Sequence, residues 1–187
     1  MPRKKTFQAF KEAGLAGPYD ERPMLPDDVH VQMCLSRNDR PQPFHLICEK
    51  DTLLALLRGE GQVEFKSTSV SSFALEFGDH VYVPAGVPHR IVPSGECVVL
   101  RYTAQQPGLE GAAWYCEHCG AELWRSVWDT AVTLSQEGYT AACEQFNRSN
   151  DLRHCASCSS DRTAIDLTPY RWREIAAEIR SERNAPG

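Results

Sequence analysis

Two pairs of cysteines far apart in the sequence place the strongest constraint on how this chain of 187 residues can fold. Cys116 and Cys119 form one C-x-x-C pair, and Cys155 and Cys158 form the other. Thiolates at this spacing can bind one metal ion, and two such pairs complete a tetrahedral site that suits zinc or a single iron. We therefore expect the second pair to fold back onto the first. Four thiolates leave no open coordination position, so the predicted site is structural.

The composition argues against a secreted protein, a membrane-spanning protein and a nucleic-acid-binding protein. The N-terminus is basic but lacks the apolar stretch of a secretory signal, and no apolar run is long enough to span a membrane. We therefore expect a cytoplasmic protein with reduced thiols, in which Cys34, Cys48 and Cys97 are buried and inert. Twenty basic and 25 acidic residues give a net charge of -5, which does not favour binding to nucleic acid.

The middle of the chain has the pattern of an all-β domain. Short apolar or alternating runs are separated by turns such as Arg58-Gly59-Glu60-Gly61, and this spacing is typical of an antiparallel sandwich or barrel. The predicted strands are Val29–Leu35, Phe44–Cys48, Leu53–Leu57, Gln62–Phe65, Ser72–Leu75, His80–Val83 and Cys97–Tyr102.

Both ends of the chain have helical patterns. We expect a short helix over Lys5–Ala13, and a second helix that begins at Thr168-Pro169 and ends at about Arg183. The second helix should place Trp172, Ile175 and Ile179 on one buried face. The predicted organisation is an N-terminal helix and arm (1–28), a β barrel (29–106), a four-cysteine metal segment (107–165) and a C-terminal helix (166–187).

A longer motif indicates which barrel this is. The segment Gly78–His89 matches G-x5-P-x-G-x2-H, the second motif of the cupin superfamily. A turn at Gly78-Asp79 precedes a strand to Pro84, and the next turn directs His89 toward the barrel mouth. The resemblance implies a cupin (double-stranded β-helix, or jelly-roll) barrel in which His89 is a metal ligand.

Further ligands are expected from the hairpin that precedes this motif. His45, Glu49 and Asp51 are spaced by even numbers of residues, which places them on one face of a regular strand, whereas Thr52 points the other way. His45, Asp51 and His89 would form a two-histidine, one-carboxylate triad that binds Fe(II) and leaves positions for substrate and dioxygen. Glu49 is the alternative carboxylate.

The chain as a whole resembles 3-hydroxyanthranilate 3,4-dioxygenase, a cupin that in bacteria carries a C-terminal rubredoxin-like metal site. The resemblance extends from about Val29 to Cys158. It depends on His45 and its spacing to Asp51, on Leu57-Arg58-Gly59, on the Gly78–His89 motif and on Trp114-Tyr115-Cys116-x-x-Cys119. It implies that His45, Asp51 and His89 hold the catalytic iron and that the four cysteines hold iron or zinc. Alignment on Leu57-Arg58-Gly59 would instead place Thr52 at the carboxylate position.

The residues that would bind substrate depart from the family pattern. The family's first arginine falls beside Arg40, its second falls on Pro93 with Arg90 on the same loop, and its glutamate falls on Arg101. Replacing an acceptor by a cation changes which groups this wall of the pocket can bind. Arg101, with Arg40 or Arg90, would then orient an anionic group, or Arg101 would simply pair with a nearby carboxylate.

The leading hypothesis from sequence is a non-haem Fe(II) extradiol dioxygenase that uses O2 to open the ring of a 2-aminophenol or catechol-like aromatic acid. One alternative is a different reaction on an aromatic biosynthetic intermediate at the same barrel metal. Another is a cupin that binds a small molecule without catalysis. The apolar helix faces and the family resemblance also predict a homodimer.

Overall fold

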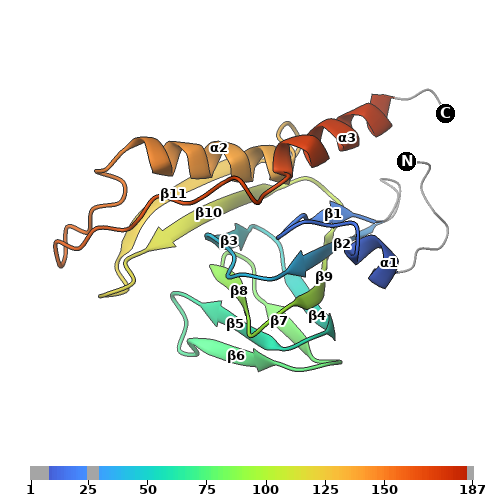
Figure 1. Ribbon diagram of the computed structural model, residues 1–187, viewed down its shortest axis with the longest axis horizontal. Coiled ribbons are helices and arrows are strands. Elements are labelled where there is room, and N and C mark those ends of the chain that lie inside the picture. The colour runs from blue at the N-terminus through green and yellow to red at the C-terminus, as the bar shows by residue number, and fades with distance from the viewer. Residues whose placement is uncertain (1–8, 25–29, 185–187) are drawn as a thin grey trace.

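The computed structural model describes residues 9–24 and 30–184, and its scaffold consists of two antiparallel sheets. Sheet A has five strands and sheet B has six (Figure 1). In spatial order, sheet A contains β1 (Arg22–Pro23), β2 (Val31–Asn38), β9 (Cys97–Ala104), β4 (Thr52–Arg58) and β7 (His80–Val83). Sheet B contains β11 (Glu122–Asp129), β10 (Leu109–Tyr115), β3 (His45–Cys48), β8 (His89–Pro93), β5 (Gly61–Phe65) and β6 (Ser72–Leu75).

The two sheets face each other around an apolar core, which confirms the predicted barrel. Alternate residues of β4, β5, β7 and β9 point inward, among them Leu54, Val63, Val83 and Val99. Each of the seven predicted strands is present, with ends shifted by a few residues. Strand β8 was not predicted, because the sequence after the Gly78–His89 motif had been assigned to a loop.

The Gly78–His89 motif forms the two turns that the sequence predicts, one at Gly78 and one at Gly86. Gly78 and Gly86 have φ angles of 89° and 76°, a left-handed conformation that favours glycine. The backbone N–H of Gly86 donates to the carbonyl of Cys48 at 2.7 Å, which ties this turn to the end of β3. His89 follows as the first residue of β8. The motif therefore sets the point at which the chain enters sheet B.

Three helices complete the fold: α1 (Ala9–Ala13), α2 (Ser135–Arg148) and α3 (Trp172–Asn184). Helix α2 lies across the β10–β11 hairpin, and α3 packs beside α2 (Figure 1). The predicted N-terminal helix is confirmed only from Ala9, since residues 5–8 lie outside the described part. Helix α3 starts at Trp172 instead of Pro169, because residues 168–171 form a turn in which the Tyr170 N–H donates to the Leu167 carbonyl.

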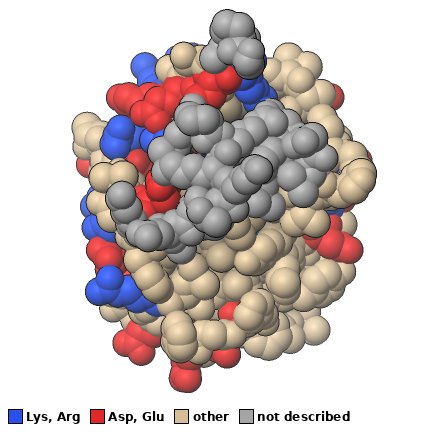
Figure 2. Space-filling model, turned by 90° about the vertical axis from the view of Figure 1, so that its right-hand side faces the viewer, with Lys and Arg blue, Asp and Glu red and all other residues tan. Residues whose placement is uncertain are grey.

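The helices pack through aromatic and aliphatic side chains. Trp172 is buried in a cluster with Phe44, Trp114 and Tyr139, which joins α3 and α2 to β3 and β10. Ile175 and Ile179 are buried against Leu134 and Ala176. The predicted apolar face of the C-terminal helix is therefore buried within this chain. Figure 2 views the molecule from the right-hand side of Figure 1: among the described residues, Lys, Arg, Asp and Glu side chains gather toward one side of this face, and the lower part carries few of them.

The metal segment is continuous with the barrel. The expected boundary between residues 106 and 107 falls between β9 and β10, yet β10 pairs with β3, with Ala113 opposite His45. Helix α2 and strands β10 and β11 were also not predicted in this segment. Within the described ranges, no helix has the length and apolar character needed to cross a membrane.

Candidate functional sites

The four predicted cysteines meet at one point. Cys116 and Cys119 follow the end of β10, and Cys155 and Cys158 lie in the loop between α2 and α3. Their four sulfur atoms all lie within 4.8 Å of one another. The Cys116 and Cys158 sulfurs are 3.5 Å apart, as are those of Cys119 and Cys155. This cluster has the composition and closeness of a tetrahedral thiolate site for zinc or iron.

The two halves of this site have the same backbone conformation. The N–H of Gly120 donates to the carbonyl of Cys116 at 2.9 Å, and the N–H of Ser159 donates to that of Cys155 at 2.8 Å. Gly120 and Ser159 both have a positive φ, of 76° and 56°. This equivalence could not be predicted from the residue types, because a serine in the left-handed conformation is uncommon.

Ser160 is a polar group at this site that sequence reasoning missed. Its hydroxyl lies 3.1 Å from the sulfurs of both Cys116 and Cys158. Hydrogen bonds from Ser160 and then from the backbone amides of Cys119 and His118 lower the pKa of Cys116 to about 5. A lowered thiol pKa favours the thiolate that a metal ion requires.

The barrel histidines lie on opposite faces of sheet B. His89 pairs with Leu46 on β3 and with Phe65 on β5, so these three side chains share one face of sheet B. Phe65 lies in the core between the sheets, and Leu46 lies in the adjoining cluster covered by α2 and α3. Side chains alternate along a strand, so His45, the neighbour of Leu46, points to the outer face. Both imidazoles are 2 % exposed. The predicted His45–His89 pair is therefore not formed.

The carboxylate candidates do not reach His89 either. Asp51 is exposed and accepts a hydrogen bond from the N–H of Ala85 at 2.9 Å. Glu49 accepts from the N–H of Leu109 at 2.7 Å. Thr52 shares the inner face with Leu54, as alternation along β4 requires, so the alignment on Leu57-Arg58-Gly59 gives the correct inward position.

An iron ion in the barrel would therefore lack its predicted ligand set. Leu46 and Thr52 occupy the inward positions where the hairpin was expected to supply a histidine and a carboxylate. Among the residues described, the four cysteines are the only group of three or more His, Cys, Asp or Glu side chains close enough to hold one ion. His89 itself has its Nδ1 3.1 Å from the carbonyl of Val87, and burial lowers its pKa to about 4. The residues present do not fit a two-histidine, one-carboxylate iron site.

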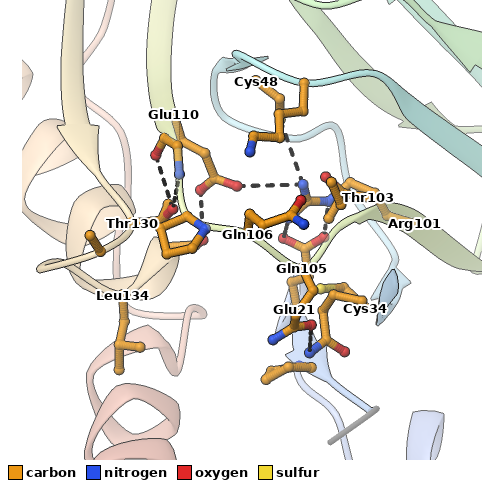
Figure 3. A pocket seen from close by; sticks show the side chains of 18 of the residues that line it. Glu21, Cys34, Cys48, Arg101, Thr103, Gln105, Gln106, Glu110, Thr130 and Leu134 are labelled. Carbon is orange, nitrogen blue, oxygen red and sulfur yellow. Dashed lines mark hydrogen bonds and ion pairs between the residues drawn. The ribbon is translucent and has the colours of Figure 1, made fainter. Parts of the chain in front are cut away.

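The barrel mouth opens into a cavity of about 630 Å³ lined by strands β2, β9 and β10 and by the start of α2. Arg101, which is 5 % exposed, lies at its inner wall (Figure 3). Its Nε and Nη2 both donate to the carboxylate of Glu21, the latter at 2.7 Å. Its Nη1 lies 3.6 Å from Cys48 Sγ and 3.6 Å from a carboxylate oxygen of Glu110. The alternative in which Arg101 pairs with a carboxylate is thus confirmed.

This ion pair is held by further contacts from α2. The hydroxyl of Tyr139 donates to Glu21 at 2.8 Å, and the side-chain amide of Gln136 donates to the Glu21 carbonyl. Burial alone would lower the pKa of Arg101, but the adjacent Glu21 raises it well above its ordinary value, so the guanidinium stays charged. Glu21 lies 80 positions before Arg101. The signal that could have found it is the rule that a buried arginine requires a carboxylate partner.

The other predicted substrate arginines lie elsewhere. Arg40 is exposed and pairs with Asp39 at 2.9 Å. Arg90 points to the outer face of sheet B and pairs with Glu64 at 2.6 Å. Neither lines the cavity at the barrel mouth. The buried cysteines behave as predicted, since burial raises the pKa of Cys48 to about 12 and that of Cys97 to about 11.

Comparison with known proteins assigns this chain to no family. No protein-family model and no curated protein matches the sequence. The solved structures with a similar fold include hydroquinone 1,2-dioxygenase from Sphingomonas sp. TTNP3, with 13% identity and a TM-score of 0.48 over 52% of this chain and 72% of that one. Hydroquinone 1,2-dioxygenase PnpCD has 20% identity and a TM-score of 0.46 over 52% and 71%. A cupin-2 domain protein from Shewanella frigidimarina has 18% identity and a TM-score of 0.45 over 52% and 93%.

At these identities and TM-scores the likeness carries no statement about activity. The fold follows from the chain's own features: two facing antiparallel sheets, the inner core between them and the Gly78–His89 turn motif. The protein is a mainly β cupin barrel with a C-terminal four-cysteine cluster and a terminal helix.

Proposed function

We propose that this protein is a cupin that binds a small polar molecule at its barrel mouth, without a metal ion in the barrel. The observation that carries the proposal is the buried Arg101 in the wall of the cavity of about 630 Å³. This volume lies within the ~300–1,000 Å³ typical of small-molecule sites. A buried ion pair contributes little net stability, so its presence in a cavity wall favours a binding role.

The hydrogen-bonding groups of the cavity wall suggest the chemistry of the ligand. Arg101 Nη1 donates to Cys48 Sγ at 3.6 Å and lies 3.6 Å from Glu110, so an acidic or hydroxyl oxygen of a ligand would replace these longer contacts. Glu110, which accepts from the Ser135 hydroxyl at 2.6 Å, lies beside it and can accept from an amino group. A molecule with adjacent amino and acid or hydroxyl groups, such as an aminophenol or an aminobenzoate, satisfies both.

The four-cysteine cluster is proposed to hold iron or zinc as a structural element. It ties the end of β10 to the loop that connects α2 and α3. When bound, the metal would link the tip of this loop to the end of β10, whereas Leu152, Ile165, Leu167 and Tyr170 pack the rest of the loop against the aromatic cluster. With four thiolates it has no open position for a substrate.

Ring cleavage by a non-haem iron dioxygenase is the second candidate. The observation that favours it is His89, which the cupin-type motif places on the inner face of the barrel. The described residues around His89 do not supply the other ligands that this iron would require. The homodimer predicted from the sequence also remains a proposal.

Metal analysis of the purified protein separates the two candidates. We expect one equivalent of zinc or iron per chain, unchanged by His89→Ala and lost with Cys155→Ser. Two equivalents, one of which disappears with His89→Ala, would favour the dioxygenase instead.

Ligand binding is then measured by calorimetry without oxygen, using 2-aminophenol, 2-aminobenzoate and catechol as probes. Glu110→Gln should weaken binding of the amino-bearing probes by ~10-fold, equivalent to about 1.4 kcal/mol. Glu49→Gln, which removes a carboxylate outside the cavity, should leave it unchanged. Admission of oxygen should not alter the mass of the bound probe, and a product with added oxygen would overturn the proposal. No binding of any probe would also contradict it.

A further inference from the structure

The outer face of sheet B carries a second cavity, of about 590 Å³, on the opposite side from the barrel core. It extends from β5 and β8 across β3 to the end of β10 and the first cysteine pair. We call it the outer pocket. Its charged, histidine and tyrosine side chains are His45, Glu64, Lys66, Arg90, Tyr115, Glu117 and Arg162.

His45 is an unsatisfied polar group at the inner wall of this pocket. The imidazole is 2 % exposed, and neither ring nitrogen has a hydrogen-bond partner within the described part of the chain. Its only ring contact there is an edge-on one with Tyr115, at 4.9 Å between ring centroids. A buried polar group without a partner costs ~1–3 kcal/mol, and a bound water or ion is one of the few ways in which native proteins accommodate it.

The outer pocket also has an excess of positive charge. Arg90 pairs with Glu64 at 2.6 Å, and Arg162 pairs with Glu117 at 3.2 Å. Lys66 has no carboxylate oxygen within 4 Å among the described residues. Its Nζ lies 5.5 Å from the centre of the Tyr115 ring. Three cations therefore face two carboxylates.

The protonation state of His45 fits this environment. Burial in the first place, and then the positive charges of Arg90, Lys66 and Arg162, lower its pKa to about 2. The imidazole is therefore neutral at ordinary pH and has one N–H to donate and one nitrogen to accept. A neutral donor surrounded by cations suits a negatively charged acceptor.

We propose that the outer pocket is a binding site for a small oxyanion, with the His45 N–H donating to the anion and Lys66 supplying the uncompensated charge. Phosphate and carboxylate share this chemistry, and the experiment distinguishes them. Arg90 and Arg162 contribute to the field while remaining paired with their carboxylates. The site is separate from the barrel mouth, and the proposal does not depend on the function proposed above.

The test is a titration of the full-length, metal-loaded protein with inorganic phosphate and, separately, with benzoate, at constant ionic strength. Binding is followed by calorimetry and by the ¹⁵N chemical shifts of the His45 ring. We expect a saturable shift of the His45 nitrogens with one of the two anions, and the anion that binds identifies the class. An oxyanion should also raise the pKa of His45.

Two variants and two controls make the result specific. Lys66→Gln should weaken binding by at least ~10-fold, which is about 1.4 kcal/mol, and His45→Leu should abolish it. Lys50→Gln, at the rim of the other cavity, and His80→Leu, at an exposed histidine of β7, should have no effect. No saturable shift with either anion, or binding that persists in both Lys66→Gln and His45→Leu, would overturn the proposal. Lys66 is partly exposed, so Lys66→Gln should fold normally. It therefore tests the proposal even if His45→Leu fails to fold.

Discussion

The two cavities of this protein lie on opposite faces of the same sheet and satisfy their polar groups in opposite ways. At the barrel mouth, Arg101 and Glu21 are buried together, and Tyr139 completes their hydrogen bonds. In the outer pocket, His45 is equally buried but has no hydrogen-bond partner among the described residues, and Lys66 has no carboxylate near it. The first arrangement is organised before a ligand arrives. The second lacks a negatively charged partner.

The difference arises from the alternation of side chains along β3. Leu46 faces inward opposite His89, so its neighbour His45 must face outward. A shift of one residue in this strand would exchange the two. The barrel interior would then gain a second imidazole, and the outer pocket would gain a leucine. The register of one short strand thus decides which face carries the unsatisfied group.

Removal of the structural metal should have the largest effect, because it breaks one cavity and spares the other. Cys155→Ser should abolish metal binding and release the loop and the β10 end that wall the outer pocket. Structural four-ligand sites can contribute ~10 kcal/mol or more to folding. Hydrogen exchange should show lost protection at the Tyr115 end of β10, at the Glu122 end of β11 and in the 149–171 loop. Protection should be retained in β9 and at the Leu109 end of β10, which lines the barrel mouth.

Cys143→Ala is the matched control for that experiment. Cys143 is fully buried in α2 and lies outside the cluster. It should lower stability through lost packing but leave the metal content unchanged. Equal loss of protection in β9 and β10 after Cys155→Ser would show that the barrel and the metal segment unfold as one unit.

Arg101→Met tests the closed network of the barrel mouth. It leaves the Glu21 carboxylate buried without its cation, which should lower the free energy of unfolding by about 3–5 kcal/mol. The double variant Glu21→Gln with Arg101→Met removes both charges and should recover most of that loss. Urea denaturation of the three proteins provides the comparison. If the double variant were as unstable as Arg101→Met, packing of the arginine rather than its charge would hold this wall.

Local sequence patterns predicted the parts of the structure that depend on local chemistry. The C-x-x-C spacing identified all four cluster cysteines, and the Gly78–His89 motif identified a turn that directs His89 into the barrel. Alternation of apolar residues identified the strands of the barrel. In each case the physical cause lies within a few residues, so it can be read from one segment.

The parts that could not be predicted depend on contacts between distant segments. His45 was assigned to the inner face because its spacing to Asp51 suggested one continuous strand, whereas β3 ends at Cys48 and β4 begins at Thr52. The change of strand breaks the parity on which that assignment rested. Glu21 was missed because its role exists only when Arg101 is brought beside it.

Acid should destabilise both faces of sheet B through their histidines. Burial lowers the pKa of His45 to about 2 and that of His89 to about 4, below the ~6.5 of an unfolded histidine. Between pH 6.5 and 4 only the unfolded chain binds these protons, so stability is fully present above 6.5 and falls as the pH falls. Each histidine contributes a slope of up to ~1.4 kcal/mol per pH unit.

Denaturant titrations across this pH range test the two histidines separately. His89→Gln should remove one of the two slopes at every anion concentration. A bound oxyanion raises the pKa of His45, so saturating anion should flatten the other slope in the wild type. His80→Gln, at an exposed ring, should leave the profile unchanged. A profile without slope between pH 6.5 and 4 would contradict neutral burial of both rings.

The smallest expected effect compares the same substitution on the two faces. His45→Leu removes two unpartnered ring nitrogens from a buried position, so it should raise the free energy of unfolding by about 1 kcal/mol in anion-free buffer. His89→Leu should instead lower it, because the contact between the Nδ1 and the part-buried Val87 carbonyl is lost and leucine offers that oxygen no donor. Saturating anion should then stabilise the wild type but not His45→Leu, and their order of stability should reverse. If His45→Leu is destabilising without anion, ordered water already forms hydrogen bonds to the imidazole. The two cavities would then differ in their bound water, and the outer pocket would not need an anion.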